Sequence, residues 1–169
     1  SLMPTNLYGP GDNYHNINSH VIPSLIRKFH NAKIKKFDKV TCWGSGKPLR
    51  EFLYVDDLAK ACIFLIKEWN PVFEYSSEEL RDSSKCLINV GSKDEVSIKE
   101  LAQKIALACE FKGEIIWDIK KPDGTPRKKL DICKINKLGW EAKTKLDEGL
   151  KLTIDCFKKE LIDKTVRIN

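Results

Sequence analysis

Short apolar stretches alternate with longer stretches whose apolar residues repeat at helical spacing, and this alternation most constrains the fold. Strands are expected at residues 40–43, 50–55, 87–90 and 114–119, and residues 1–10 are typical of a strand end that runs into a Gly-Pro turn. Helices are expected at residues 19–33, 56–69, 98–110, 131–138 and 144–161. Strands that alternate with helices predict an α/β fold, here with few, short strands and several helices.

The ends and buried faces of these helices can also be predicted. Ser19 is the expected N-cap of the first helix, residues 97–100 have the spacing of a capping box, and Thr144 is expected to cap the last helix. Helical spacing places Ile66 on the buried face of the second helix and Leu107 on that of the third.

The chain contains no glycine-rich turn of the kind that opens a dinucleotide-binding α/β domain. Residues 44–49 read Gly-Ser-Gly-Lys-Pro-Leu, but leucine stands where the dinucleotide fingerprint needs glycine, and proline follows the lysine where a P-loop needs Ser or Thr. The segment is therefore expected to be a tight turn between two strands. The missing turn and the opening in mid-strand predict a fragment of a larger α/β protein.

Composition disfavours several classes of protein. Apolar residues make up 41% of the 169 residues and charged residues 32%, as in soluble globular domains, and no apolar run is long enough to span a membrane. The six cysteines include no C-x-x-C pair, so we expect small buried hydrophobic residues in a reducing cytoplasm, and no metal site. The net charge of +6 favours an anionic partner. Nucleic acid is not expected, because no aromatic residues interleave with a basic stripe.

A first cluster of polar residues crowds the turn and helix start between residues 4 and 28. Loops that follow strand ends are where α/β proteins hold ligands. His20 lies at the predicted helix start, and a histidine there can exchange protons near neutral pH. The alternative is a solvated turn in which His20 is only a surface or capping residue.

A second cluster is the basic loop at residues 120–129, which two prolines stiffen. Arg127 could hold a diphosphate with both ends of its guanidinium group, and Asp123 could accept a hydrogen bond from a sugar hydroxyl. Trp43 and Arg50, seven residues apart, suit a pocket for a sugar or a base. The alternatives are a solvated run of charges and a core position for Trp43.

Several of these motifs resemble the GDP-L-fucose synthase family of extended short-chain dehydrogenases. The matching segments are Pro-Thr-Asn-Leu-Tyr-Gly-Pro at 4–10, Asn-Ser-His-Val-Ile-Pro at 18–23, Trp-Gly-Ser-Gly at 43–46, Arg-Glu-Phe-Leu at 50–53 and Lys-Pro-Asp-Gly-Thr-Pro-Arg-Lys at 121–128. The likeness extends to about residue 157. It implies the C-terminal, substrate-binding part of such an enzyme, with most of the Rossmann part missing: residues 1–18 would end a Rossmann strand, and residues 19–169 would bind the nucleotide-sugar.

The resemblance also implies a reaction and roles for residues. The family epimerises C3 and C5 of GDP-4-keto-6-deoxy-D-mannose and reduces C4 with hydride from NADPH, and its second acid/base is a cysteine upstream of this chain. By the same likeness His20 is catalytic, and cofactor contacts fall on Pro4, Thr5, Asn6, Leu7 and His20. Substrate contacts fall on Lys28, Trp43, Arg50, Asp123, Arg127 and Lys128. The complete protein is expected to be a cytoplasmic homodimer, and the fragment an inactive monomer.

Two positions depart from the family pattern. Lys28 stands where relatives usually have arginine, so the charge is kept but the two-pronged grip is lost. Glu114 stands where a basic residue is common. The sequence therefore leaves open another nucleotide-sugar epimerase or reductase, and a nucleotide-sugar-binding module without chemistry.

Overall fold

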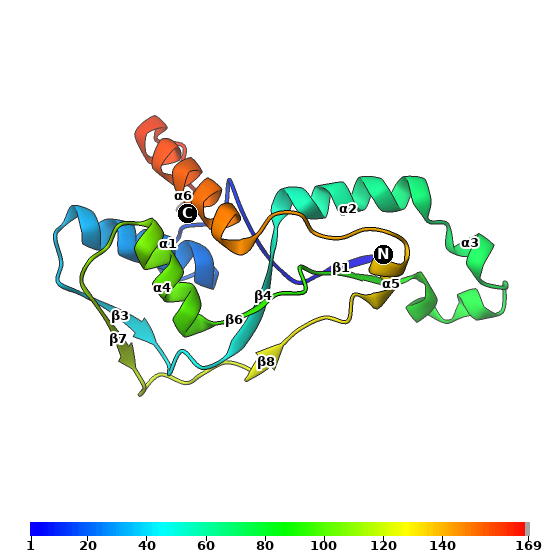
Figure 1. Cartoon of the computed structure of the whole chain (residues 1–169), viewed down its shortest axis with the longest axis horizontal. Coiled ribbons are helices and arrows are strands. Elements are labelled where there is room, and N and C mark those ends of the chain that lie inside the picture. Colours follow the sequence, from blue (N-terminus) through cyan, green and yellow to red (C-terminus); the bar gives the residue numbers. More distant parts are fainter. Residues whose placement is uncertain (168–169) are drawn as a thin grey trace.

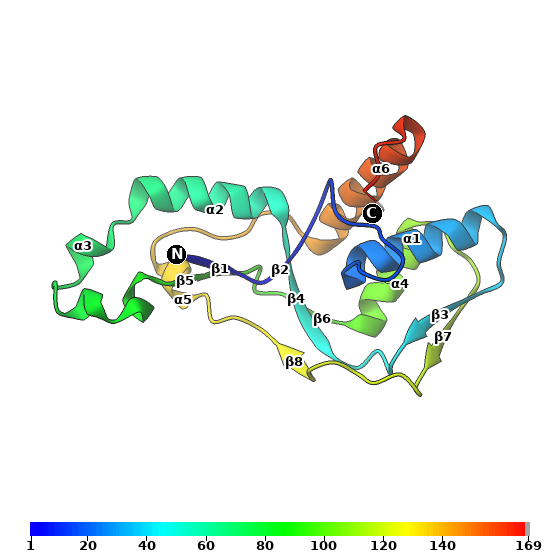
Figure 2. The same cartoon turned by 180° about the vertical axis from the view of Figure 1, so that it is seen from behind.

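The computed structural model describes residues 1–167 and shows an elongated α/β molecule with two lobes (Figure 1). One lobe holds helices α1 (Val21–Ile34), α4 (Ile98–Ala108) and α6 (Leu146–Asp163). The other holds α2 (Val55–Glu68), α3 (Pro71–Glu74) and α5 (Cys133–Lys137), with two short 3-10 turns, Glu79–Arg81 and Ser83–Cys86. The expected α/β class is confirmed. Figure 2 shows from behind that strand β4 (Leu49–Tyr54) runs between the lobes.

Within residues 1–167, the strands form three small sheets. Strand β1 (Leu2–Pro4) pairs in parallel with β5 (Ile88–Val90), and β3 (Lys39–Trp43) pairs in parallel with β7 (Glu114–Asp118). In the third sheet, β4 pairs in parallel with β2 (Asn6–Tyr8) and β8 (Arg127–Lys128), and antiparallel with β6 (Glu95–Ser97). The sequence does not predict β6 and β8, because strands of three and two residues are defined by their partner β4 and not by a pattern of their own.

Alternate residues of β4 face two separate hydrophobic cores, as the two-residue period of a strand requires. Phe52 and Tyr54 belong to the larger core, which packs against α1, α4 and α6. Leu53 belongs to the smaller core, with residues of α2, β5 and α5. Arg50 therefore shares a face with Phe52, and Glu51 shares the opposite face with Leu53.

Two predicted helix caps are wrong, and one is confirmed. The N-cap of α1 is His20, not Ser19. The N-cap of α6 is Lys145, and the Thr144 amide donates instead to the Asp57 carboxylate at 2.7 Å. The capping box of α4 is present: Ser97 and Glu100 each receive a hydrogen bond from the other's backbone amide.

Two predicted core residues are wrong. Ile66 is 84% exposed and Leu107 is 80% exposed. Helix α2 buries Asp57, Ala61 and Leu65, so its inward face is centred about one residue before Ile66. Both side chains lie at the edge of an amphipathic stripe, where spacing alone does not decide whether a neighbouring element covers them.

All six cysteines are free, but only Cys42 and Cys109 are buried. The expectation that cysteines are core residues is therefore wrong for Cys133, which is exposed, and only partly right for the three half-buried ones.

Within residues 1–167, no group of three or more His, Cys, Asp or Glu side chains is placed to hold a metal ion. No helix of this part of the chain combines the length and apolarity needed to cross a bilayer.

Candidate active site

Residues 4–7 carry the chain from one sheet to the next. Pro4 is exposed at the end of β1, and Asn6 begins β2. Between the strands, the buried Thr5 donates from Oγ1 to the Glu51 carbonyl oxygen at 3.1 Å, and Asn6 Nδ2 donates to the same oxygen at 2.8 Å. These two bonds fix the segment against β4. Among the described residues, nothing donates to Oδ1 of Asn6, so this oxygen is available to a ligand.

His20 opens α1 beside this segment. Its backbone is extended, its side chain makes no capping hydrogen bond, and it is exposed. It lines a pocket of about 310 Å³, and four of the five residues expected at the cofactor, all but Pro4, line this pocket. The lining residues are Thr5, Asn6, Leu7, His20, Val21, Ile22, Pro23 and Phe52.

Asp12 is the acidic neighbour of His20. Both residues line a smaller hollow of about 230 Å³ beside the Gly-Pro-Gly turn. Burial raises the pKa of Asp12, although the hydrogen bond from the Asn13 amide and the nearby His20 oppose that rise. The sequence places both residues in one polar cluster, and the fold brings them to one hollow.

Trp43 lies at the end of β3 and is 68% exposed, so the alternative of a core tryptophan is wrong. The ammonium groups of Lys28 and Lys121 lie 5.6 Å and 5.4 Å from its ring centre, within the range of a cation–π interaction. Lys28 also donates to the Thr41 carbonyl oxygen at 3.4 Å. Trp43 and Lys28 line a pocket of about 340 Å³ together with Asn16, Ile17, Ser19, Val21, Ser24, Leu25, Cys42, Ile98 and Trp117.

The Gly-Ser-Gly segment that follows Trp43 is the predicted tight turn between β3 and β4. Gly44 and Gly46 have φ values of 77° and 74°, which favour glycine. The Asp123 carboxylate accepts hydrogen bonds from the Ser45 amide at 2.8 Å and the Ser45 hydroxyl at 2.6 Å. The Ser45 hydroxyl and amide hold the pKa of Asp123 below its usual value. The basic loop is thus fastened to the turn.

Arg50 and the basic loop lie together, although about 70 residues separate them in sequence. Strand β8 pairs with β4 so that Lys128 stands opposite Arg50, on one face of the sheet. A Cβ built on Gly124 would lie 3.1 Å from the Arg50 guanidinium, so the loop passes close to it. Arg50 Nη1 donates to the Leu49 carbonyl oxygen at 2.7 Å, and no acid among the described residues forms an ion pair with Arg50.

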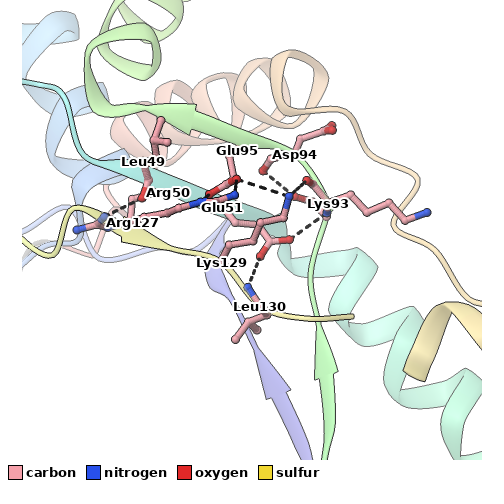
Figure 3. Close-up of polar contacts among 10 residues, drawn as sticks. Leu49, Arg50, Glu51, Lys93, Asp94, Glu95, Arg127, Lys129 and Leu130 are labelled. Atoms are coloured by element: carbon pink, nitrogen blue, oxygen red, sulfur yellow. Dashed lines mark hydrogen bonds and ion pairs between the residues drawn. The ribbon is translucent and has the colours of Figure 1, made fainter. Parts of the chain in front are cut away.

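Arg127, in contrast, lies on the other face of the sheet (Figure 3). Its Nε and Nη2 atoms donate to the two carboxylate oxygens of Glu95, at 2.8 Å and 2.5 Å. Hydrogen bonding and the positive charge of Arg127 lower the pKa of Glu95. The structure therefore does not bring Arg127 together with Arg50 and Lys128. Glu114, the second position that departs from the family pattern, forms an ion pair with Lys39 across β3 and β7 at 3.5 Å.

Glu51 is a residue that the sequence analysis missed. It is fully buried, and its carboxylate accepts hydrogen bonds from the Lys93 amide at 2.9 Å and the Leu130 amide at 3.2 Å (Figure 3). Its carbonyl oxygen holds Thr5 and Asn6. One signal was available: Glu51 stands between Leu49 and Leu53 at the two-residue period of a strand, on the face that carries the buried Leu53. Glu51 joins the cofactor-side segment to two distant loops.

Comparisons with known proteins show which proteins the whole chain is similar to. Residues 1–74 match the model of the family described as NAD dependent epimerase/dehydratase. GDP-L-fucose synthase 1 of Arabidopsis thaliana is 48% identical over 164 residues, which are 97% of this chain and 47% of that protein. The chain thus spans about half the length of the curated relatives it matches.

Solved structures give the same result. A GDP-L-fucose synthetase from Naegleria fowleri superposes with a TM-score of 0.82 at 33% identity, over 99% of this chain and 47% of that one, and a second structure of that protein is bound to NADP. A GDP-6-OMe-4-keto-L-xylo-heptose reductase from C. jejuni has a TM-score of 0.81 at 29% identity, over 94% of this chain and 53% of its own. The chain is therefore similar to GDP-L-fucose synthases over about half of their length, and its first 74 residues match the model of the NAD dependent epimerase/dehydratase family.

Proposed function

We propose that this chain is the nucleotide-sugar-binding half of an NADPH-dependent epimerase-reductase that converts GDP-4-keto-6-deoxy-D-mannose to GDP-L-fucose. One observation carries the proposal: the pocket of His20 and the pocket of Trp43 share Val21, in the first turn of α1. One extended ligand can therefore place its sugar beside His20 and its nucleotide beside Trp43. In this proposal residues 1–18 belong to the cofactor side, and residues 19–169 bind the substrate.

The nucleotide end fits the aromatic and basic side chains. The exposed ring of Trp43 offers a stacking face, and Lys28, Arg50 and Lys128 supply positive charge for a diphosphate. A carboxylate accepts more than two hydrogen bonds, so Asp123 can hold Ser45 and still accept one from a ligand hydroxyl. Arg127 is proposed to support the loop through Glu95 and not to touch the substrate.

The sugar end fits proton transfer by His20. Protons next to a ketone are acidic enough for a side-chain base, and an imidazole nitrogen of His20 would take or return the proton at C3 or C5. His20 is free of a capping bond, so its ring is available for this role. A second acid/base, a cysteine in the resembling enzymes, would come from outside this chain.

The cofactor side fits a nicotinamide carboxamide. Oδ1 of Asn6 is available, and the pocket of about 310 Å³ brings residues 5–7 next to His20. NADPH, when bound, would supply hydride to C4 of the sugar. Pro4, Thr5 and Leu7 would form the wall against which its ring lies, with Thr5 and Asn6 held by the Glu51 carbonyl oxygen. In the cytoplasm the complete protein would be a homodimer, and this chain alone a monomer without reductase activity.

A GDP-heptose is a competing candidate for the substrate. The heptose reductase above also carries a GDP-sugar in its name and matches this chain at 29% identity. A GDP-heptose substrate would use the same nucleotide contacts and would differ only at the His20 pocket. A nucleotide-sugar binder without chemistry is the third candidate, because in this proposal most of the cofactor site lies outside this chain.

Binding of nucleoside diphosphates to the purified chain tests the nucleotide part of the proposal. Calorimetric titration is expected to give a lower Kd for GDP than for ADP, UDP or dTDP, and Trp43→Ala is expected to weaken GDP binding. Trp69→Phe, in the other lobe, is the matched control. Equal affinities for all four diphosphates would overturn the assignment.

The purified chain is also expected not to oxidise NADPH with the 4-keto sugar, and turnover would contradict the claim that it is only half of the enzyme.

A further inference from the structure

The segment between β2 and α1 has a buried anchor and an exposed tip. Tyr14 is fully buried, and its ring lies against Phe157 of α6 with centroids 4.3 Å apart. The following residues 16–18 are exposed, and the aliphatic side chain of Ile17 is 84% exposed. Because the tip gains no burial, its conformation must be fixed by local hydrogen bonds.

His15 makes most of those bonds. Its Nδ1 atom accepts hydrogen bonds from the Ile17 amide at 3.1 Å and the Asn18 amide at 3.0 Å. Its own amide donates to Oδ1 of Asn13 at 3.0 Å, and Asn13 Nδ2 donates to the Asn18 carbonyl oxygen at 3.4 Å. A neutral imidazole that accepts at Nδ1 carries its proton on Nε2.

The tip that His15 holds is also a wall of the Trp43 pocket. Asn16, Ile17 and Ser19 line the cavity of about 340 Å³ together with Trp43. The same tip leads directly into His20, the N-cap of α1. The position of three backbone residues therefore sets one side of the cavity and the entry of the chain into the helix.

We propose that His15 is a positioning residue: through Nδ1 it fixes residues 16–18, of which Asn16 and Ile17 line the Trp43 pocket, and thereby raises the affinity of that pocket for a nucleoside diphosphate. His15 does not touch the ligand in this role. The ligand class rests on the proposed function, whereas the order of the tip does not.

Two substitutions distinguish the contribution of the Nδ1 acceptor from that of the aromatic ring. His15→Phe keeps an aromatic ring and removes the acceptor. His15→Asn removes the ring but keeps an acceptor that can bond to the amide two residues later, as in an Asx-turn. Lys151→Ala, at an exposed position of α6 that lines neither pocket, is the control.

Three measurements on the purified chain test the proposal. In ¹⁵N NMR, His15 is expected to show the neutral Nε2–H tautomer with an unprotonated Nδ1. Hydrogen exchange at the Ile17 and Asn18 amides is expected to be about tenfold faster in His15→Phe than in the wild-type chain, while His15→Asn and Lys151→Ala stay within about threefold of it. The Kd for GDP is expected to rise about tenfold in His15→Phe and to be restored in His15→Asn.

The outcomes distinguish the two proposals. A proton on Nδ1, or unchanged exchange at both amides in His15→Phe, overturns the role of His15. Faster exchange with an unchanged Kd for GDP overturns the link between the tip and affinity. If the wild-type chain binds no GDP, the proposed function fails and the positioning claim fails for that ligand, while the tautomer and exchange data still decide the order of the tip. If His15→Phe does not fold, the proposal is decided by the His15 tautomer in the wild-type chain and by hydrogen exchange and the Kd for GDP in His15→Asn.

Discussion

The carboxylate of Asp123 accepts hydrogen bonds from both the backbone amide and the side-chain hydroxyl of Ser45, at 2.8 Å and 2.6 Å. The two residues are 78 positions apart, and their contact fastens the basic loop to the turn after Trp43. Gly44 is essential to the contact, because a Cβ at that position would lie 2.3 Å from Oδ1 of Asp123. One rim of the candidate site is therefore built from two distant segments.

The first prediction concerns Gly44. Gly44→Ala is expected to lower the melting temperature more than Gly139→Ala, the matched control. Both glycines have positive φ, but a Cβ at Gly139 meets nothing within 4 Å, so it reports backbone strain alone. That strain is worth about 1–2 kcal/mol. The double variant Gly44→Ala/Asp123→Ala should recover part of the loss, because the clash is removed. Equal melting temperatures for the two single variants would show that Asp123 does not occupy this position.

The second prediction compares two arginines in the complete enzyme. Arg50→Ala is expected to raise KM by about 10- to 150-fold, which corresponds to roughly 1.5–3 kcal/mol for a lost charge-assisted hydrogen bond. Arg127→Ala is expected to change KM less than threefold, because Glu95 already holds this guanidinium on the other face of the sheet. Steady-state kinetics of both variants check the prediction. Similar increases in KM would mean that both arginines reach the substrate.

The third prediction concerns His20 in the complete enzyme. His20→Gln is expected to slow epimerisation by about 10²- to 10⁴-fold, the usual contribution of a general acid or base. Hydride transfer to an already epimerised ketone should be affected much less. Deuterium exchange at C3 and C5 and NADPH oxidation measure the two steps separately. Equal losses in both would indicate that His20 positions the substrate and does not move protons.

The fourth prediction concerns the pH dependence of stability through Asp57. This carboxylate is 1% exposed and accepts hydrogen bonds from the amides of Lys143 and Thr144. Burial alone would raise the pKa of Asp57, but the bonds from Thr144, Lys60 and Lys143 outweigh burial and hold the pKa below its usual value. The group therefore stabilises the fold above its unfolded pKa of about 3.9, and this contribution is lost as the pH falls through the lower, folded value.

Urea unfolding at pH 7 and in steps below pH 5 checks that sign. Asp57→Asn is expected to cost about 1–3 kcal/mol at pH 7 and to flatten the loss of stability in acid. Asp56→Asn, at the exposed neighbouring position, is the control and should follow the wild-type profile. A variant at Asp57 that keeps the full acid dependence would contradict the prediction.

The sequence by itself determined the local structure and the chemical types of the site residues. The α/β alternation, the capping box at Ser97 and Glu100, and the tight turn at Gly44 all depend on neighbouring residues, and each is present. The motif around His20 and the resemblance to an epimerase-reductase family could also be found without a structure. These features are encoded within a few residues of one another, so a pattern can carry them.

Tertiary structure alone decided which charges meet. Arg50 and Arg127 look alike in the sequence, yet the register of β8 on β4 places them on opposite faces, and Glu95 forms an ion pair with Arg127 and not with Arg50. Burial of Glu51 and Asp57 depends in the same way on amides that are 42 to 87 residues away. Strand pairing and long-range hydrogen bonds are set by packing of the whole chain, and no local spacing specifies them.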